Sequence, residues 1–263
     1  MRTSSSLLLS GAALLTIGCG KPPEAPGKLE DLAGYMFEHM GDEDTDALEA
    51  GVENLDSWLN KSDHLSLTME GYTISQLPES AVDALDARDR DVDGLVGASV
   101  ATVLRPGPQK LSRVLVKADP TKVYPDTYSR YERSYTTDPD CFVAQDCDSA
   151  RLRAETVSAY ALGLEVTADF KAEYRWVESE HGLALVQRTW LERPAEVSVD
   201  WIGVSAQYFL SVNIPRANGK TLRLQGTWIA AELGDTPVPE ATALNMVIDS
   251  MRTGDEELAA WVE

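Results

Sequence analysis

Residues that commonly carry catalysis or bind metals are scarce in this sequence. It has 3 histidines and 3 cysteines among 263 residues, and the histidines are scattered along the chain. The motifs of serine hydrolases, zinc proteases, phosphate-binding loops and thiol oxidoreductases are missing. These absences argue against the enzyme classes that such motifs identify. We also expect no cofactor and no metal site. A serine or carboxylate site assembled from distant parts of the chain stays open as the alternative.

Positive charge is also scarce. Lys and Arg together number 23 against 43 Asp and Glu, a formal net charge of −20 at pH 7, and no stretch is rich in Lys or Arg. A chain this acidic repels phosphate backbones and anionic lipid headgroups. We therefore expect no nucleic-acid partner, and the plainest role of the charge is solubility.

The first 18 residues have the composition of a secretory signal. Arg2 gives a positive start, and Leu7–Ile17 is an apolar stretch too short to span a bilayer. The stretch Leu15–Cys19 resembles the lipobox of bacterial lipoprotein precursors. Gly18 stands before the cysteine, although Thr16 occupies a place where that family prefers leucine. The resemblance implies that the cysteine is lipidated and becomes the first mature residue, with an ordinary secretory signal as the alternative.

A lipidated Cys19 implies a protein of the bacterial cell envelope that contacts the membrane through its lipid anchor. Gly20 follows it, and the absence of aspartate at that position favours the outer over the inner membrane. Residues 20–28 are rich in proline and glycine, as expected of a tether. The other two cysteines, Cys141 and Cys147, are predicted to form a disulfide, because exported proteins meet an oxidising environment.

Alternation of apolar and polar residues predicts a curved antiparallel β-sheet. Every second residue is apolar or aromatic in Leu164–Trp176, and the pattern recurs in Ile202–Ile214 and Leu222–Ala230. A period of two is typical of a strand with one dry and one wet face. The step Asn218-Gly219 between the last two stretches is a strong hairpin signal. Further strands are expected over Leu95–Leu104, Leu111–Ala118, Arg151–Leu162 and Leu183–Leu191.

Apolar residues spaced three and four apart predict helices at both ends of the chain. They cover Leu29–Met40 and Asp44–Asn60, which form a helical hairpin, and Pro239–Arg252, which Gly254 ends. Another helix is expected from Asp119-Pro120 through Tyr131, with aspartate as its cap and proline at its first position. A stripe of tyrosines along a helix more often packs in the core than lines a ligand site, so we expect these tyrosines to be core residues.

These elements divide the chain into four segments: a signal peptide (1–18), a lipidated cysteine and tether (19–28), an N-terminal helical segment (29–94) and a domain of sheet plus helix (95–263). Asp89, Asp91 and Asp93, followed by Gly94, resemble the first half of an EF-hand calcium loop. The bidentate glutamate of that loop is replaced by Val100, so a solvated turn is favoured over a calcium site.

The order of elements from about residue 110 to 253 resembles the START-like helix-grip fold. A strand that ends in Ala118–Tyr124 is followed by a helix, consecutive antiparallel strands and a long C-terminal helix. In that family the sheet curls around the last helix and leaves an apolar cavity, so the resemblance implies an α+β fold of that kind. The alternatives are the open barrel with a helical lid of periplasmic lipoprotein carriers and a lipocalin-like barrel.

All three folds wrap a sheet around an apolar interior, which favours a membrane-anchored module that binds an apolar small molecule. The residues expected to line its pocket are Phe170, Tyr174, Tyr208, Leu210 and Trp228, with Met251 on the lid. The alternative function is an envelope protein-interaction or structural module whose core is fully packed and holds no ligand.

Overall fold

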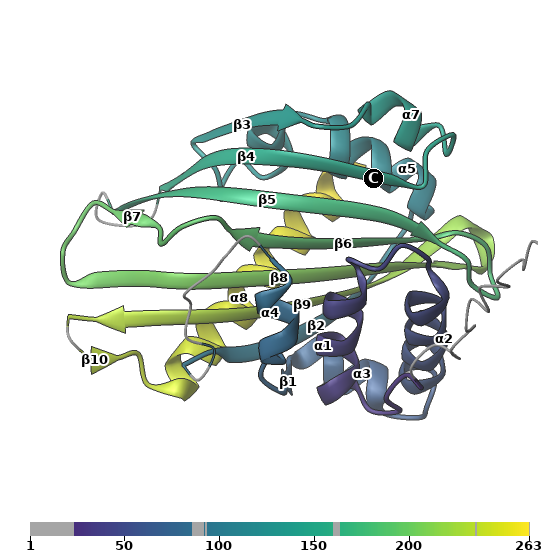
Figure 1. Ribbon diagram of the computed structural model, residues 1–263, viewed down its shortest axis with the longest axis horizontal. Helices are drawn as coiled ribbons and strands as arrows, with labels where there is room; N and C mark the ends of the chain where they lie inside the picture. Colours follow the sequence, from purple (N-terminus) through teal and green to yellow (C-terminus); the bar gives the residue numbers. More distant parts are fainter. Residues whose placement is uncertain (1–23, 86–91, 93, 160–163, 235, 263) are drawn as a thin grey trace, which may run out of the picture.

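One antiparallel sheet of ten strands separates two layers of helices (Figure 1). The computed structural model describes residues 24–85, 92, 94–159, 164–234 and 236–262. The main strand order is β1-β2-β9-β8-β6-β5-β4-β3, while β10 pairs with β9 and β7 pairs with β5. The sheet packs against the C-terminal helix, so the predicted α+β arrangement is confirmed.

The strands are β1 (Tyr72–Ile74), β2 (Val96–Leu104), β3 (Arg130–Tyr135), β4 (Ser149–Ala159), β5 (Glu165–Val177), β6 (Ala184–Leu191), β7 (Glu196–Val197), β8 (Ile202–Arg216), β9 (Lys220–Leu233) and β10 (Thr236–Pro237). The helices are α1 (Leu29–His39), α2 (Asp46–Leu59), α3 (His64–Glu70), α4 (Glu79–Asp83), α5 (Pro108–Ser112), α6 (Pro120–Val123), α7 (Pro139–Val143) and α8 (Glu240–Val262). A π-helix, η1 (Arg113–Lys117), follows α5, and a short 3-10 turn, η3 (Ala217–Gly219), joins β8 to β9.

The two faces of the sheet are covered by different parts of the chain. Figure 1 shows α1, α2 and α4 on one side and α8 on the other. The first side, here called the N-terminal face, buries Tyr208, Leu210 and Trp228 in one cluster with α1 and α2. The other, here called the α8 face, packs Ala98 and Val100 of β2 against α8. The predicted helical hairpin is therefore an integral layer of the fold.

Alternation places neighbouring residues of a strand on opposite faces, and where α8 crosses β8 and β9 both faces are dry. Val212 and Asn213 of β8 point to opposite sides, and each is 0% exposed. The expectation of one wet face holds for β4, whose exposed and buried residues alternate, and is wrong for β8 and β9. The reason is the second helical layer, which strand alternation alone does not reveal.

A buried arginine fastens the N-terminal layer to the sheet. The Arg188 side chain is 5% exposed, and its guanidinium contacts the Glu173 carboxylate at 2.7 Å. The same group donates to the carbonyl of Phe37 near the end of α1 at 3.1 Å. Nearby, Arg175 donates to the carbonyl of Asp42 in the following turn at 2.6 Å. Because carbonyls at a helix end lack partners within the helix, these two cations stabilise the end of α1.

Three predicted elements are wrong, each for a local reason. The stretch Leu111–Ala118 is helical, since Pro108 at the start of α5 favours a helix there. The helix opened by Asp119 has the expected cap, with Thr121 donating at 3.1 Å, yet it ends at Val123. The last helix continues through Gly254 to Val262, because its later turns are buried against the sheet.

The predicted disulfide between Cys141 and Cys147 is present, with the two Cα atoms 5.3 Å apart. It closes the loop that carries α7, whose Phe142 is fully buried and stacks on Trp176 at 5.3 Å between ring centroids. The Trp176 indole also donates to the carbonyl of Phe142 at 2.9 Å. The disulfide thus restrains a segment that closes one end of the core on the α8 face.

Replacing both Cys141 and Cys147 by serine should lower the free energy of unfolding by about 2 kcal/mol, because the open loop has more conformations in the unfolded chain. Urea unfolding of the variant and of the oxidised wild type measures the difference. Wild type under reducing conditions is the control and should behave like the variant. Equal midpoints for all three samples would contradict the stabilising role.

Candidate functional site

The helix α8 crosses the sheet and does not run along a single strand. Its first half packs Val247 and Met251 against β2. Its last turns place Leu258 and Val262 in a second cluster with residues of β4, β5, β6 and α7. A helix lying across the strands can cover only part of each strand, so the rest of this face needs other cover.

Under the middle of α8 lies a buried polar network built on an ion pair. Arg223 of β9 and Asp255 of α8 contact each other at 2.9 Å, and both side chains are 4% exposed. The remaining guanidinium hydrogens bind the oxygens of Ser211, Asn213 and Gln225 at 2.6, 2.9 and 3.3 Å. The second carboxylate oxygen of Asp255 has no hydrogen-bond partner among the described residues. The network fixes α8 to the sheet at this point.

Beside the network, part of the α8 face remains open to solvent. We call this the open patch and define it by Phe170, Gln187, Thr189, Gln207 and Phe209, all of them partly exposed. They lie in β5, β6 and β8, which have strands on both sides, and Thr189 pairs directly with Phe209. Side chains in the middle of a sheet are normally covered, so solvent reaches this face between the sheet and its helices.

Small residues form the floor around the open patch. Ala168 and Ala172 lie on either side of Phe170 along β5 and point to the same face, and both are buried. In the neighbouring strand β4, Ala154 pairs with Phe170 and Thr156 pairs with Ala168. Phe170 therefore stands partly exposed between two short, buried side chains.

A chain of tyrosines borders this area. Tyr131 pairs with Thr156 across β3 and β4 and so lies on the α8 face. Its ring packs edge to face on Tyr128 at 4.9 Å, and Tyr128 packs in the same way on Tyr124 at 6.1 Å. Burial raises the pKa of Tyr124 to about 12 and also raises the pKa of Tyr131. Both phenols are therefore neutral near pH 7, and they present aromatic surface with hydrogen-bonding ends.

The tyrosine segment is tied to α8 by one carboxylate. Glu257 accepts a hydrogen bond from the Asp126 backbone at 2.7 Å and one from the Thr127 hydroxyl at 2.8 Å. On the far side of the segment, Arg133 donates to the carbonyls of Leu115, Val116 and Ala118. The tyrosines are thus held between the end of η1 and the last third of α8.

The six residues predicted to line one pocket do not meet. Phe170, Tyr174 and Met251 lie on the α8 face, whereas the other three, Tyr208, Leu210 and Trp228, lie on the N-terminal face. The strand register explains the split. Phe170 pairs with Leu191 and Tyr208 pairs with Trp190, and adjacent residues of one strand point to opposite faces. On the N-terminal face the three predicted residues are fully buried by α1 and α2.

The residues that sequence reasoning missed are polar ones inside the fold. Arg223 and Gln225 alternate with apolar neighbours in β9, so they were assigned to a wet face, yet they are 4% and 5% exposed. Asp255 lies beyond the predicted helix end at Arg252, and in the longer α8 it faces inward. The one signal for it is its spacing of four residues from Met251, which places both on the same stripe of α8.

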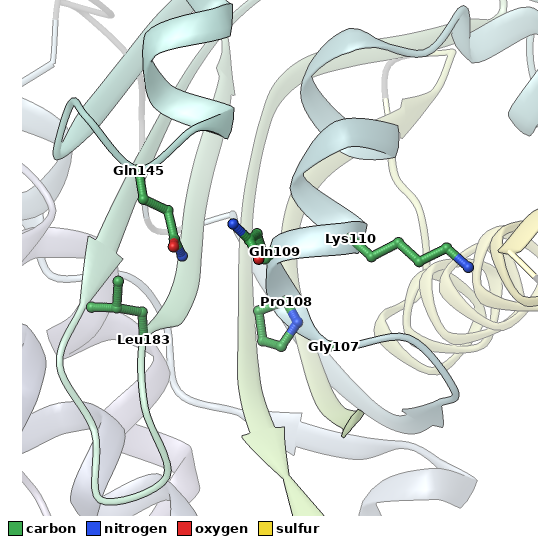
Figure 2. Close-up of a pocket in the computed structure, with 6 residues that line it drawn as sticks. All are labelled: Gly107, Pro108, Gln109, Lys110, Gln145 and Leu183. Atoms are coloured by element: carbon green, nitrogen blue, oxygen red, sulfur yellow. The ribbon is translucent and has the colours of Figure 1, made fainter. Parts of the chain in front are cut away.

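A separate shallow pocket of about 400 Å³ lies at the start of α5, away from the open patch. Figure 2 shows the amides of Gln109 and Gln145 directed toward each other across it, with Leu183 beside Gln145 and the Lys110 side chain extending away. Its lining has no group of acids, histidines or cysteines. We therefore do not treat it as the functional site.

Some predicted features lie outside the described residues, namely Cys19 and the aspartates at 89, 91 and 93. Within the described part of the chain, no group of three or more His, Cys, Asp or Glu is arranged to hold a metal ion. In the same part, the helices are too short or too polar for any of them to cross a membrane.

Asp255→Ala should lower the free energy of unfolding by roughly 3–5 kcal/mol, because it leaves the Arg223 guanidinium buried without its counter-charge. The double variant Arg223→Met with Asp255→Leu removes both charges and should cost less than the single change. Urea unfolding of the three proteins tests this. Equal losses for the single and double variants would show that side-chain packing, and not charge, dominates at this position.

No protein-family model and no curated protein matches this chain. Among solved structures it is similar to a START superfamily protein from Mycobacterium smegmatis, at 8% sequence identity and a TM-score of 0.44, covering 63% of this chain and 96% of that one. It is also similar to a STAR-related lipid transfer protein from Xanthomonas axonopodis, at 12% identity and a TM-score of 0.41, covering 65% of this chain and 94% of that one. Because these scores are low, the description of the fold rests on the strand order and helix positions of this chain itself.

Proposed function

We propose that this protein is a lipid-anchored binding module of the bacterial cell envelope, which holds a small, largely apolar molecule between the α8 face of its sheet and α8. The observation that carries the binding role is the open patch. Five side chains in the centre of the sheet stay partly exposed although helices lie on both faces. Concave sites of mixed apolar and polar lining are the usual form of small-molecule sites.

The chemistry of the area supports a ligand with an apolar body. Phe170 and Phe209 offer aromatic faces, and the tyrosines from Tyr124 to Tyr131 border the same side of the sheet. The alternative, a packed interaction module without ligand, is supported on the N-terminal face, where α1 and α2 cover the sheet completely around Trp228.

Thr189→Trp should weaken binding of the fluorophore N-phenylnaphthylamine by on the order of tenfold, because the indole fills the space above β6. The measurement is a fluorescence titration of purified, delipidated protein. Thr73→Trp, a change at an exposed strand position, is the matched control and should bind like wild type. Thermal unfolding of both variants confirms that they are folded.

The outcome against the proposal is specific. If the wild type binds no fluorophore, or if Thr189→Trp binds as well as Thr73→Trp, the open patch is not a ligand site. The packed interaction module would then be the better description of the protein.

The anchoring role rests on the lipobox-like stretch that ends at Cys19. Cys19→Ser should leave the precursor uncleaved or release the mature protein from membranes, because stable anchoring needs the acyl chains attached to this cysteine. Membrane fractionation and intact mass of wild type and variant measure the effect. A wild type that carries no lipid, or a variant that stays with the membranes after cleavage, would contradict the lipobox interpretation.

A further inference from the structure

We infer that the ligand of the open patch is a neutral amphipath, with an apolar body and an uncharged hydrogen-bonding group such as a hydroxyl or an amide. The inference rests on the binding function proposed above and names the class of molecule. It follows from two features of the α8 face: its two strand arginines are occupied by protein partners, and the polar groups of the open patch are uncharged.

Two arginines, Arg133 and Arg223, are the only Lys or Arg that the described strands place on the α8 face. The Arg223 guanidinium pairs with Asp255 and donates hydrogen bonds to three further side-chain oxygens, and the residue is 4% exposed. An anionic group entering here would find its guanidinium already bound. It would also approach the carboxylate of Asp255, whose second oxygen is an unpaired acceptor. Recognition of a carboxylate or phosphate by this arginine is therefore disfavoured.

The Arg133 guanidinium is occupied by backbone carbonyls. Its two terminal nitrogens donate to three backbone carbonyls at the end of η1, at 2.7, 2.9 and 3.0 Å. The guanidinium carbon also lies 5.0 Å from the centre of the Tyr131 ring. Its remaining nitrogen, Nε, is buried and has no partner among the described residues, so a ligand cannot reach it without rearrangement. Arg133 therefore stabilises the end of a helix and does not offer a free cation to a ligand.

The polar groups of the open patch are the amides of Gln187 and Gln207 and the hydroxyl of Thr189, and none of them carries a charge. The side-chain amide of Gln187 donates one hydrogen bond to Thr189 at 3.1 Å, and its carbonyl oxygen has no partner among the described residues. The Gln207 side chain makes no hydrogen bond within the described chain, and the residue is partly exposed. A carboxamide both donates and accepts, which suits a hydroxyl or an amide group.

The spacing of the two amides fits an extended molecule. Gln187 lies two residues before Thr189 in β6, and Gln207 lies two residues before Phe209 in β8. Because β6 and β8 are antiparallel, the two amides lie on opposite sides of the Thr189–Phe209 pair. Four residues along a strand correspond to about 13 Å. Between them lies the apolar surface of Phe209, with Phe170 on the next strand, β5. A ligand lying along β6 and β8 would thus keep its apolar body over aromatic rings and its neutral polar group at one amide.

The test compares ligands that differ only in charge. Purified, delipidated protein is loaded with N-phenylnaphthylamine, which is then displaced with dodecanol or with dodecanoate at about pH 8, where the carboxylate is ionised. Salt at about 0.15 M screens the long-range repulsion between dodecanoate and this acidic chain. Dodecanol should displace the fluorophore at a concentration on the order of tenfold lower than dodecanoate does.

Three variants locate the effect. Gln207→Leu should weaken dodecanol binding about fivefold more than it changes binding of the fluorophore, because a hydrogen bond to the hydroxyl is lost. Gln207→Arg adds a free cation to the patch and should shift the preference toward dodecanoate. Gln109→Arg makes the same change of charge at an exposed position of α5, outside the patch, and should keep the wild-type preference.

The results that would overturn the inference differ from those that would overturn the function. Dodecanoate displacing the fluorophore as well as dodecanol, or Gln207→Leu binding dodecanol like wild type, overturns the neutral-ligand class and leaves the binding function standing. A wild type that shows no saturable binding of N-phenylnaphthylamine overturns both.

Discussion

Burial of both faces of the sheet where the two helical layers cover it is the constraint on which the rest of this structure depends. Each face needs its own helical layer, and each layer is fastened by one buried arginine with one carboxylate. Arg188 and Glu173 fix the end of α1 on the N-terminal face, and Arg223 and Asp255 fix the middle of α8 on the other. Ion pairs in such places contribute more to the choice of one geometry than to net stability, because removing two charges from water is costly. They set where each helix lies.

The sequence predicts the strands well because alternation is a property of the local chain. The stretches Leu164–Trp176 and Ile202–Ile214 match β5 and β8 to within two residues. Alternation does not tell whether the second face is wet or covered by another layer. Arg223 in β9 therefore had the pattern of a solvent-facing residue and is nearly fully buried. Its partner lies 32 residues away, and local patterns carry no information about such a contact.

The candidate site was harder to predict for a related reason. Whether Phe170 and Tyr208 share a pocket depends on the register between β5, β6 and β8, and a shift of one residue exchanges the faces. The apolar character of both residues was correctly identified, but periodicity within one strand cannot fix its register against the next. Glutamines such as Gln207 give no signal at all, because an exposed surface strand and the wall of a binding site use them equally well.

The direction of α8, and not its length, decides what the sheet leaves open. With 23 residues the helix is about 34 Å long, which is comparable to the longer strands. Because it crosses from β2 to the cluster of Leu258 and Val262, the part of β5 and β6 around Thr189 lies beside its path. Phe170, Thr189 and Phe209 stay partly exposed there. Aromatic side chains that remain accessible beside the core are the kind of surface that a small-molecule site on this face would use.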